Sequence, residues 1–171
     1  MYDYAVNRRW SDQYLPEVKR IVGAQLLQAA PDDLDMKHAT DLLTLDARDM
    51  RIAARIRRPG FADRYPYEFT IRSSVPSGAE TELAKIVNGY ADWMFYGHAA
   101  PDGSLASWWL IDLRAFRAAL IRRTHGSLSS GEVRNRDGSS FRWFDIRSFP
   151  SRPPLVVAAS AFPAAGLGRA P

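Results

Sequence analysis

Two strongly apolar segments constrain the fold of this chain more than any other feature. Residues 91–99 ("ADWMFYGHA") and 106–113 ("ASWWLIDL") have the length and composition of β-strands, and "APDGSL" between them has the residues of a tight turn. Aromatic residues in such strand-like runs are more often core than surface. The pattern predicts two neighbouring apolar strands that contribute aromatic side chains to the core.

The rest of the chain alternates between helical and strand-like patterns. Helices are expected at residues 11–30, 77–90 and 114–123, and strands at 39–45, 50–58, 67–74, 139–149 and 154–160. The order α-β-β-β-α-β-β-α-β-β predicts a mixed α/β fold with a single central mixed sheet flanked by helices. The first three strands are expected to pair as a meander, and the last two as a hairpin. Residues 1–160 are expected to form one domain, followed by a loose Ala/Gly/Pro-rich tail at 161–171.

Three helix starts carry residues typical of caps. Ser11 precedes the first helix, with Pro16 tolerated only in a first turn. Ser77 and Glu80 have the spacing of a capping box, and Asp112 is placed to cap the helix that follows the apolar strands.

Charge favours an anionic partner. The 171 residues carry a formal net charge of +4, and such a balance is most often associated with nucleic acid. Of the 23 basic residues only Lys19, Lys37 and Lys85 are lysines. A GC-rich genome produces the same skew, so the placement of the arginines is more informative than their number.

The absence of cysteine excludes disulfides and thiolate metal sites. No segment has the apolar length of a membrane span, and the N-terminus has no apolar signal core. We therefore expect a cytoplasmic protein with no membrane partner.

Arginines alternate with apolar residues along the expected strand at 50–58. Arg51, Arg55 and Arg57 share one face, and such like charges repel unless carboxylates or phosphates neutralise them. One reading is a solvated face with Asp46, Asp49 and Asp63 as partners. The other is a phosphate-facing sheet, because guanidinium groups match phosphate oxygens. In that reading the nucleic-acid-binding residues are Arg51, Arg55, Arg57, Arg58 and Arg72.

The order of elements over residues 11–122 resembles the core of the PD-(D/E)XK, or restriction-endonuclease-like, nuclease superfamily, which runs helix, three strands, helix, strand. The segments "ADWMFYGHA" and "WWLIDLRAFRAAL" also resemble what often follows that core. Asp41 in "ATDLL" matches the family's metal-binding aspartate, and Glu17 matches an acid that many members carry on the first helix. The resemblance implies a metal-dependent nuclease, with DNA a more frequent substrate than RNA, and the small size favours a phage or mobile-element protein.

The family's acid-x-lysine element is altered in this chain. Its positions hold Ala53 and Arg55 if the element lies on the second strand, or Thr70 and Arg72 if it lies on the third. Arginine stays protonated and cannot act as a base, so it does not replace the lysine fully.

A magnesium site would need carboxylates from elsewhere, because Mg²⁺ prefers hard oxygen ligands and a lone aspartate binds it poorly. Glu68 shares a strand face with Thr70 and Arg72 and is one candidate. Asp46 or Asp49 in the turn between strands is the alternative. In the catalytic hypothesis Asp41 with Glu68 or Glu17 holds Mg²⁺, and Arg55 or Arg72 steadies the scissile phosphate.

Two other readings need no catalysis. The chain is then an inactive relative that binds nucleic acid or an acidic protein, as an inhibitor or accessory factor does. Alternatively it is a structural protein whose apolar strands form a homodimer interface. Six aromatic residues are candidates to stack on bases if they are exposed, although core positions are the more frequent role for such aromatics: Trp93, Phe95, Trp108, Trp109, Trp143 and Phe144.

Overall fold

The computed structural model describes residues 4–29, 42–44, 50–122 and 128–160. The helices are α1 (Tyr4–Asp12), α2 (Leu15–Gln25), α4 (Phe61–Arg64), α5 (Glu82–Val87) and α6 (Leu113–Ile121), with a 3-10 turn, η2, at Ile146–Ser148. The strands are β1 (Leu27–Ala29), β2 (Leu42–Thr44), β3 (Ile52–Arg57), β4 (Glu68–Ser74), β5 (Trp93–Ala99), β6 (Leu105–Asp112), β7 (Ser130–Arg134), β8 (Ser140–Asp145) and β9 (Val156–Ala159). This confirms the predicted mixed α/β class.

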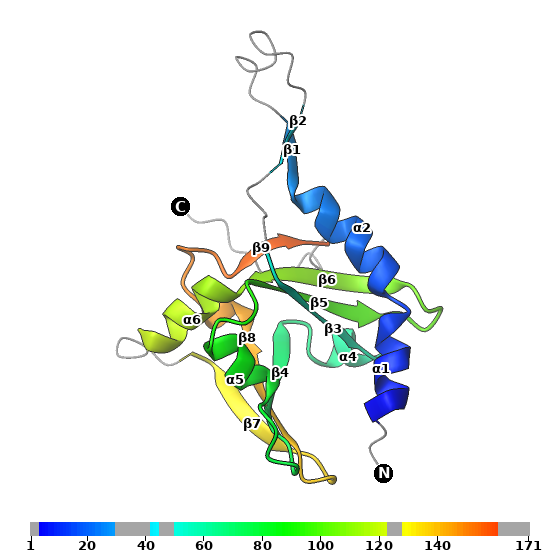
Figure 1. Cartoon of the computed structure of the whole chain (residues 1–171), viewed down its shortest axis with the longest axis vertical. Coiled ribbons are helices and arrows are strands. Elements are labelled where there is room, and N and C mark those ends of the chain that lie inside the picture. Colours follow the sequence, from blue (N-terminus) through cyan, green and yellow to red (C-terminus); the bar gives the residue numbers. More distant parts are fainter. Residues whose placement is uncertain (1–3, 30–41, 45–49, 123–127, 161–171) are drawn as a thin grey trace.

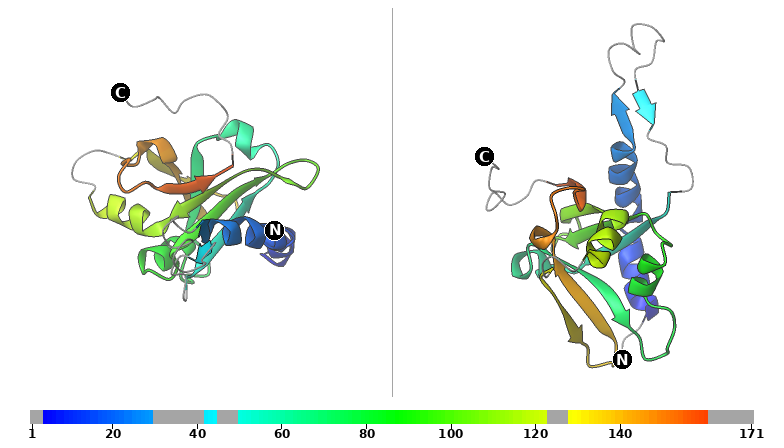
Figure 2. Two further views of the ribbon diagram at one scale, coloured as in Figure 1. Left: turned by 90° about the horizontal axis from the view of Figure 1, so that it is seen from above. Right: turned by 90° about the vertical axis from the view of Figure 1, so that its left-hand side faces the viewer.

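The strands are divided between separate sheets instead of lying in one. A four-stranded mixed sheet has the order β3-β5-β6-β9, and a three-stranded antiparallel sheet has the order β4-β8-β7. β1 and β2 form a ribbon that extends from the end of α2 (Figures 1 and 2). β3 pairs in parallel with β5, while β4 pairs with β8. The predicted meander of the first three strands is therefore wrong.

The apolar hairpin lies at the centre of the four-stranded sheet. β5 and β6 pair antiparallel from Trp93 opposite Asp112 to Ala99 opposite Leu105. Met94, Phe95 and Tyr96 are buried, which confirms the predicted core role of this segment. Other elements of the same chain cover these three side chains, so they offer no surface to a partner, and the homodimer considered from the sequence stays a prediction.

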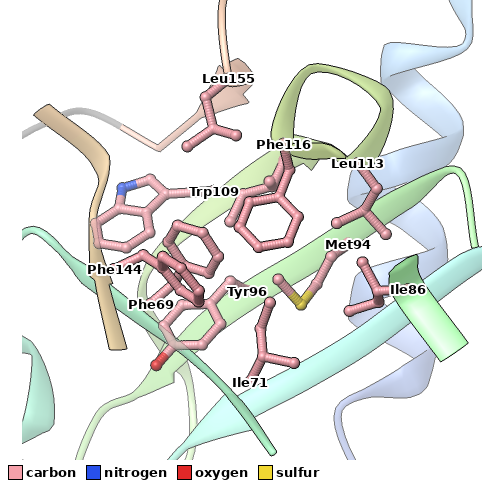
Figure 3. Packing of buried hydrophobic residues seen from close by; sticks show 11 residues of the cluster. Phe69, Ile71, Ile86, Met94, Tyr96, Trp109, Leu113, Phe116, Phe144 and Leu155 are labelled. Atoms are coloured by element: carbon pink, nitrogen blue, oxygen red, sulfur yellow. The ribbon is translucent and has the colours of Figure 1, made fainter. Parts of the chain in front are cut away.

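Packing on the two faces of the four-stranded sheet creates two hydrophobic clusters. On one face, α2 contributes Val18, Ile21 and Val22, which pack with Phe95 and Leu110. The opposite face carries the larger cluster, shown in Figure 3. Its members are Phe69, Ile71, Ile86, Met94, Tyr96, Trp109, Ile111, Leu113, Phe116, Phe144 and Leu155. The three-stranded sheet and the helices α5 and α6 thus lie on the side away from α2.

The predicted final hairpin between residues 139–149 and 154–160 is not formed. β8 pairs with β4 and β7, whereas β9 pairs with β6 in the other sheet. β8 instead makes its hairpin with β7, and Gly138 has a positive φ of 82° in the Asp-Gly turn. The predicted tail at 161–171 lies outside the described residues.

Of the three helix caps predicted from the sequence, the structure confirms one. Asp112 caps α6 by accepting hydrogen bonds from the backbone N–H groups of Arg114 and Ala115. Ser11 lies inside α1 and donates to the Arg8 carbonyl, so it does not cap the first helix. α5 begins only at Glu82, and its cap is Thr81, whose hydroxyl accepts from the Ala84 N–H.

We expect Thr81→Ala to lower the free energy of unfolding by about 1 kcal/mol, because it removes the partner of a free backbone donor. Ser77→Ala is the matched control, since Ser77 lies in the preceding turn, and its effect should stay within about 0.5 kcal/mol. Urea denaturation measures both. If Ser77→Ala lowered the free energy of unfolding more than Thr81→Ala, the result would contradict Thr81 as the cap and support the predicted capping box at Ser77.

No helix in the described part of the chain is long and apolar enough to cross a bilayer.

Candidate nucleic-acid interface

The arginines of β3 lie on the side of the four-stranded sheet that faces the larger cluster. Ile52 and Ile56 pack against the α2 cluster, whereas Ala53 packs against the larger one. Because strand side chains alternate, Arg55 and Arg57 share the side of Ala53. The predicted alternation is present, but this face is turned toward other elements of the protein.

Arg55 is neutralised by a carboxylate that sequence reasoning did not identify. Its Nη1 donates to Glu82 Oε2 at 2.6 Å, and the two side chains are only 17% and 26% exposed. The same oxygen accepts the backbone N–H of Arg72 at 3.0 Å. Glu82 therefore joins α5 to both β3 and β4. The predicted role of steadying a substrate phosphate conflicts with this partner.

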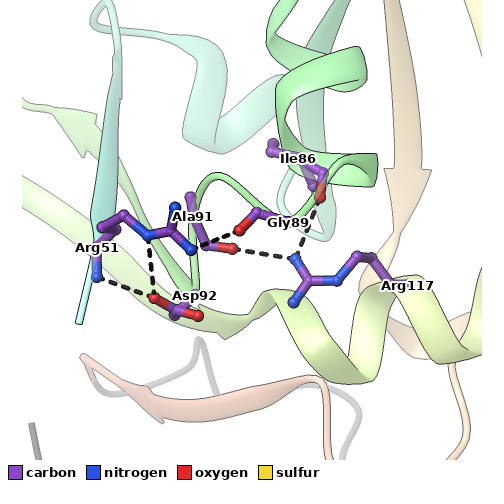
Figure 4. Close-up of polar contacts among 6 residues, drawn as sticks. All are labelled: Arg51, Ile86, Gly89, Ala91, Asp92 and Arg117. Carbon is purple, nitrogen blue, oxygen red and sulfur yellow. Dashed lines mark hydrogen bonds and ion pairs between the residues drawn. The ribbon is translucent and has the colours of Figure 1, made fainter. Parts of the chain in front are cut away.

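Arg51 also has structural partners (Figure 4). Its Nη2 donates to the Gly89 carbonyl at 2.6 Å, and its Nε lies 3.7 Å from the Asp92 carboxylate. The backbone N–H of Arg51 donates to Asp92 as well, and this hydrogen bond is the main cause of the lowered pKa of Asp92. Arg117 donates to the carbonyls of Ile86 and Ala91. The two arginines thus hold the turn between α5 and β5.

Arg58 is held by α1. Its guanidinium lies over the Trp10 ring, 4.6 Å from the centroid, and its Nη2 donates to Asn7 Oδ1 at 3.1 Å.

Arg57 is the exception among the β3 arginines. Its guanidinium lies 4.1 Å from the centroid of the Phe61 ring and 5.9 Å from that of Phe141. It forms no ion pair and no hydrogen bond with any residue in the described ranges. Burial is the main cause that lowers the pKa of Arg57; Tyr96 and Tyr65 oppose this shift, whereas the charge of Arg55 adds to it. This half-buried cation is therefore uncompensated within the described structure.

The face of the three-stranded sheet next to Arg57 carries aromatic residues. Phe141 and Trp143 alternate along β8 with Arg142 and Phe144, and Phe144 belongs to the core on the other face. Arg72 on β4 is the register partner of Phe141. On β7, Val133 pairs with Phe141, and Gly131 pairs with Trp143. We call the following set the outer aromatic face: the half-buried Arg72, Gly131, Phe141 and Trp143, and the exposed Val133. Thr70, the register partner of Trp143, is buried and lies 3.3 Å from the Tyr96 hydroxyl, so this part of the face is covered by the four-stranded sheet.

Glu68 and Asp145 are register partners at the other end of the same face. Burial raises the pKa of Glu68, and the charge of Asp145 adds to this effect, whereas Arg147 opposes it. Asp145 is occupied by Arg147, whose Nε and Nη2 donate to it at 3.0 and 2.7 Å, and its pKa is lowered by these contacts. This pair offers few free oxygens for a metal ion.

Two of the predicted magnesium ligands, Glu17 and Glu68, lie on opposite sides of the four-stranded sheet. Glu17 lies on α2, which packs on one face of the four-stranded sheet, whereas Glu68 begins β4 on the opposite side. Asp41, Asp46 and Asp49 lie outside the described residues. Among the residues that are described, no group of three or more His, Asp or Glu side chains is arranged to hold a metal ion. The sheet separates Glu17 from Glu68, so at most one of them can join Asp41, and the pairing of Asp41 with either one stays a prediction.

Sequence reasoning missed the residues that surround Arg57. Phe61 follows a Gly60 in the left-handed region, with a φ of 85°, which turns the chain back over the end of β3. Phe141 stands two residues before Trp143, and this alternation was a usable signal for a shared face. Glu82 had no signal of its own, because its contact with Arg55 spans 27 residues.

Comparisons with known proteins gave no relative: no family matches the chain, and neither a curated protein nor a solved structure is detectably similar to it.

Proposed function

We propose that this protein binds nucleic acid, and that Arg57 supplies its central phosphate contact. The observation that carries the proposal is a half-buried guanidinium that lies 4.1 Å from the Phe61 ring centroid and 5.9 Å from that of Phe141, with no carboxylate partner among the described residues. Partial burial removes some of the hydration of this guanidinium, while its nitrogen atoms still reach solvent, so an anion that contacts Arg57 displaces less water than it would at an exposed arginine.

The surroundings of Arg57 suit a phosphate group. The Phe61 ring restricts the plane of the guanidinium, so less conformational entropy is lost when its N–H groups contact a phosphate. Arg72 adds a second cation close by, since it lies opposite Phe141 in the register. The formal net charge of +4 favours the approach of a polyanion.

Binding of this kind needs no metal site. It corresponds to the accessory-module reading of the sequence, while cleavage by a magnesium-dependent mechanism would have to be built around Asp41. Substrate cutting that depends on Mg²⁺ and is abolished by Asp41→Ala would support the prediction of a nuclease.

The proposal is tested by Arg57→Gln, measured by fluorescence anisotropy with labelled DNA oligonucleotides over a range of salt concentrations. We expect about tenfold weaker binding at low salt and a salt slope reduced by about one counterion. Arg20→Gln is the matched control, because it removes the same charge from exposed α2 on the opposite side of the sheet. Its affinity should stay within about twofold of the wild type.

Two results would overturn the proposal. One is a wild-type protein that binds no nucleic acid, or binds it without salt dependence. The other is an equal loss of affinity in Arg57→Gln and Arg20→Gln, which would show a general effect of charge. Thermal denaturation of both variants checks that the fold is retained.

A further inference from the structure

We infer that the bound nucleic acid is single-stranded and that its unpaired bases stack on Trp143 and Phe141. This inference rests on the proposed function and adds the class of nucleic acid. The two rings lie on the same face of β8, the central strand of the three-stranded sheet, and both are half-exposed. The aromatic residues of the other face, Phe69 and Phe144, are buried in the core.

Gly131 provides a place for the Trp143 ring. A Cβ atom at Gly131 would lie 2.6, 2.8 and 2.9 Å from Nε1, Cε2 and Cζ2 of Trp143, closer than packing permits. Gly131 has no positive φ, so backbone conformation does not require glycine at this position. Glycine weakens a strand interior, and here its absent side chain lets the indole lie against the backbone of β7.

The spacing of the rings suits separated bases. Side chains two positions apart on a strand are roughly 7 Å apart. Bases within one strand of a duplex follow one another at about 3.4 Å. A stacked duplex therefore cannot place successive bases on both rings, whereas an extended single strand can. Base stacking on aromatic side chains is the common means by which proteins hold single strands without reading their sequence.

The charges give the strand a path across the outer aromatic face. Arg57 and Arg72 both lie beside Phe141. At the other end of the face, Glu68 and Asp145 are acidic, and Arg147 compensates only part of their charge. Asp137 in the β7–β8 turn interacts electrostatically with Arg72. We place the phosphates beside Arg57 and Arg72, with the bases directed over Phe141 and Trp143.

The test compares a short oligothymidine with a hairpin duplex of the same nucleotide number. We expect the wild type to bind the single strand about tenfold more tightly than the duplex. Trp143→Leu should weaken single-strand binding about tenfold and leave duplex binding within twofold. Trp143→Tyr keeps an aromatic surface and should restore most of the affinity, which a merely structural role would not predict. Tyr90→Leu is the control, since it removes an exposed aromatic ring from the turn before β5.

Gly131→Val supplies an independent variant, because it displaces the Trp143 ring without removing it. We expect the same selective loss of single-strand binding. Equal or tighter duplex binding by the wild type, or unchanged single-strand affinity in both Trp143→Leu and Gly131→Val, would overturn the inference. If Arg57→Gln still weakens binding in that case, the proposed function stands and only the single-strand assignment fails. If no oligonucleotide binds, both fail.

Discussion

Replacing Glu82 with alanine is expected to lower the free energy of unfolding by about 3 kcal/mol. The substitution leaves the Arg55 guanidinium without its carboxylate at a position where only 17% of the side chain is exposed. It also removes the acceptor of the Arg72 backbone N–H, which holds β4 to α5. The Nε of Arg55 is already buried without a partner, so no other hydrogen bond is in place to compensate. Urea denaturation measures the loss.

Glu80→Ala is the matched control for this experiment. Glu80 is exposed two residues earlier, and its carboxylate accepts a hydrogen bond from the Asn88 side-chain amide at 3.0 Å. Its removal should change stability by no more than about 0.5 kcal/mol. The double variant Arg55→Met/Glu82→Ala should recover part of the loss, because it removes the unpaired charge. A loss below about 1 kcal/mol in Glu82→Ala would instead indicate an ion pair screened by solvent.

Acidification from pH 7 to pH 4 is expected to remove about 3 kcal/mol of stability through His98 alone. Burial, together with the positive charge of Arg57, lowers the pKa of His98 from 6.5 to about 4. In the unfolded chain, His98 is protonated below about pH 6.5, whereas in the folded protein it is protonated only near pH 4. The contribution of neutral His98 to the free energy of unfolding is therefore fully present above the pKa of the unfolded chain, and it decreases as the pH falls toward 4. Each pKa unit corresponds to about 1.4 kcal/mol.

The surroundings of His98 explain its neutral state. The ring is 2% exposed and packs edge-on against Tyr96 and Trp109. Its Nδ1 lies 3.1 Å from the Ser107 hydroxyl, and Arg57 is its register partner on β3. These contacts provide no carboxylate to stabilise an imidazolium.

His98→Phe provides the comparison, measured by urea denaturation at several pH values. The variant should be less pH-dependent than the wild type between pH 7 and pH 5, where few carboxylates titrate. Identical slopes for the two proteins would contradict a neutral buried His98. Arg57→Gln removes a nearby positive charge and should therefore raise the pKa of His98. The free energy of unfolding of this variant should depend less on pH than that of the wild type.

Several features of the fold were predictable because they depend on local patterns. The apolar strands β5 and β6, the cap at Asp112 and the alternation of arginines on β3 all follow from residues that are close in sequence. The mixed α/β class follows from the same periodicities. The Asp-Gly turn between β7 and β8 likewise has its own local signal.

Partner choice between distant strands was not predictable in the same way. Residues 50–58 and 67–74 are neighbours in sequence, but β3 pairs with β5 and β4 pairs with β8. The residue patterns of these strands are compatible with both the predicted meander and the observed pairing, because both require only that each strand has one apolar side. The meander on which the nuclease resemblance was based is therefore not formed among the described strands, and the resemblance itself stays a prediction.

The candidate site also has features that follow from local sequence and features that depend on contacts between distant segments. The amino-acid sequence by itself determined that arginines would gather on one side of a strand and that aromatic residues would alternate on another, because side-chain direction follows from backbone periodicity. Only the tertiary structure decided which charges are neutralised. It paired Arg55 with Glu82 and Arg51 with Asp92, and it left Arg57 between Phe61 and Phe141. Such pairings depend on contacts between segments far apart in the chain, where electrostatic energy is set by distance and burial that no local pattern contains.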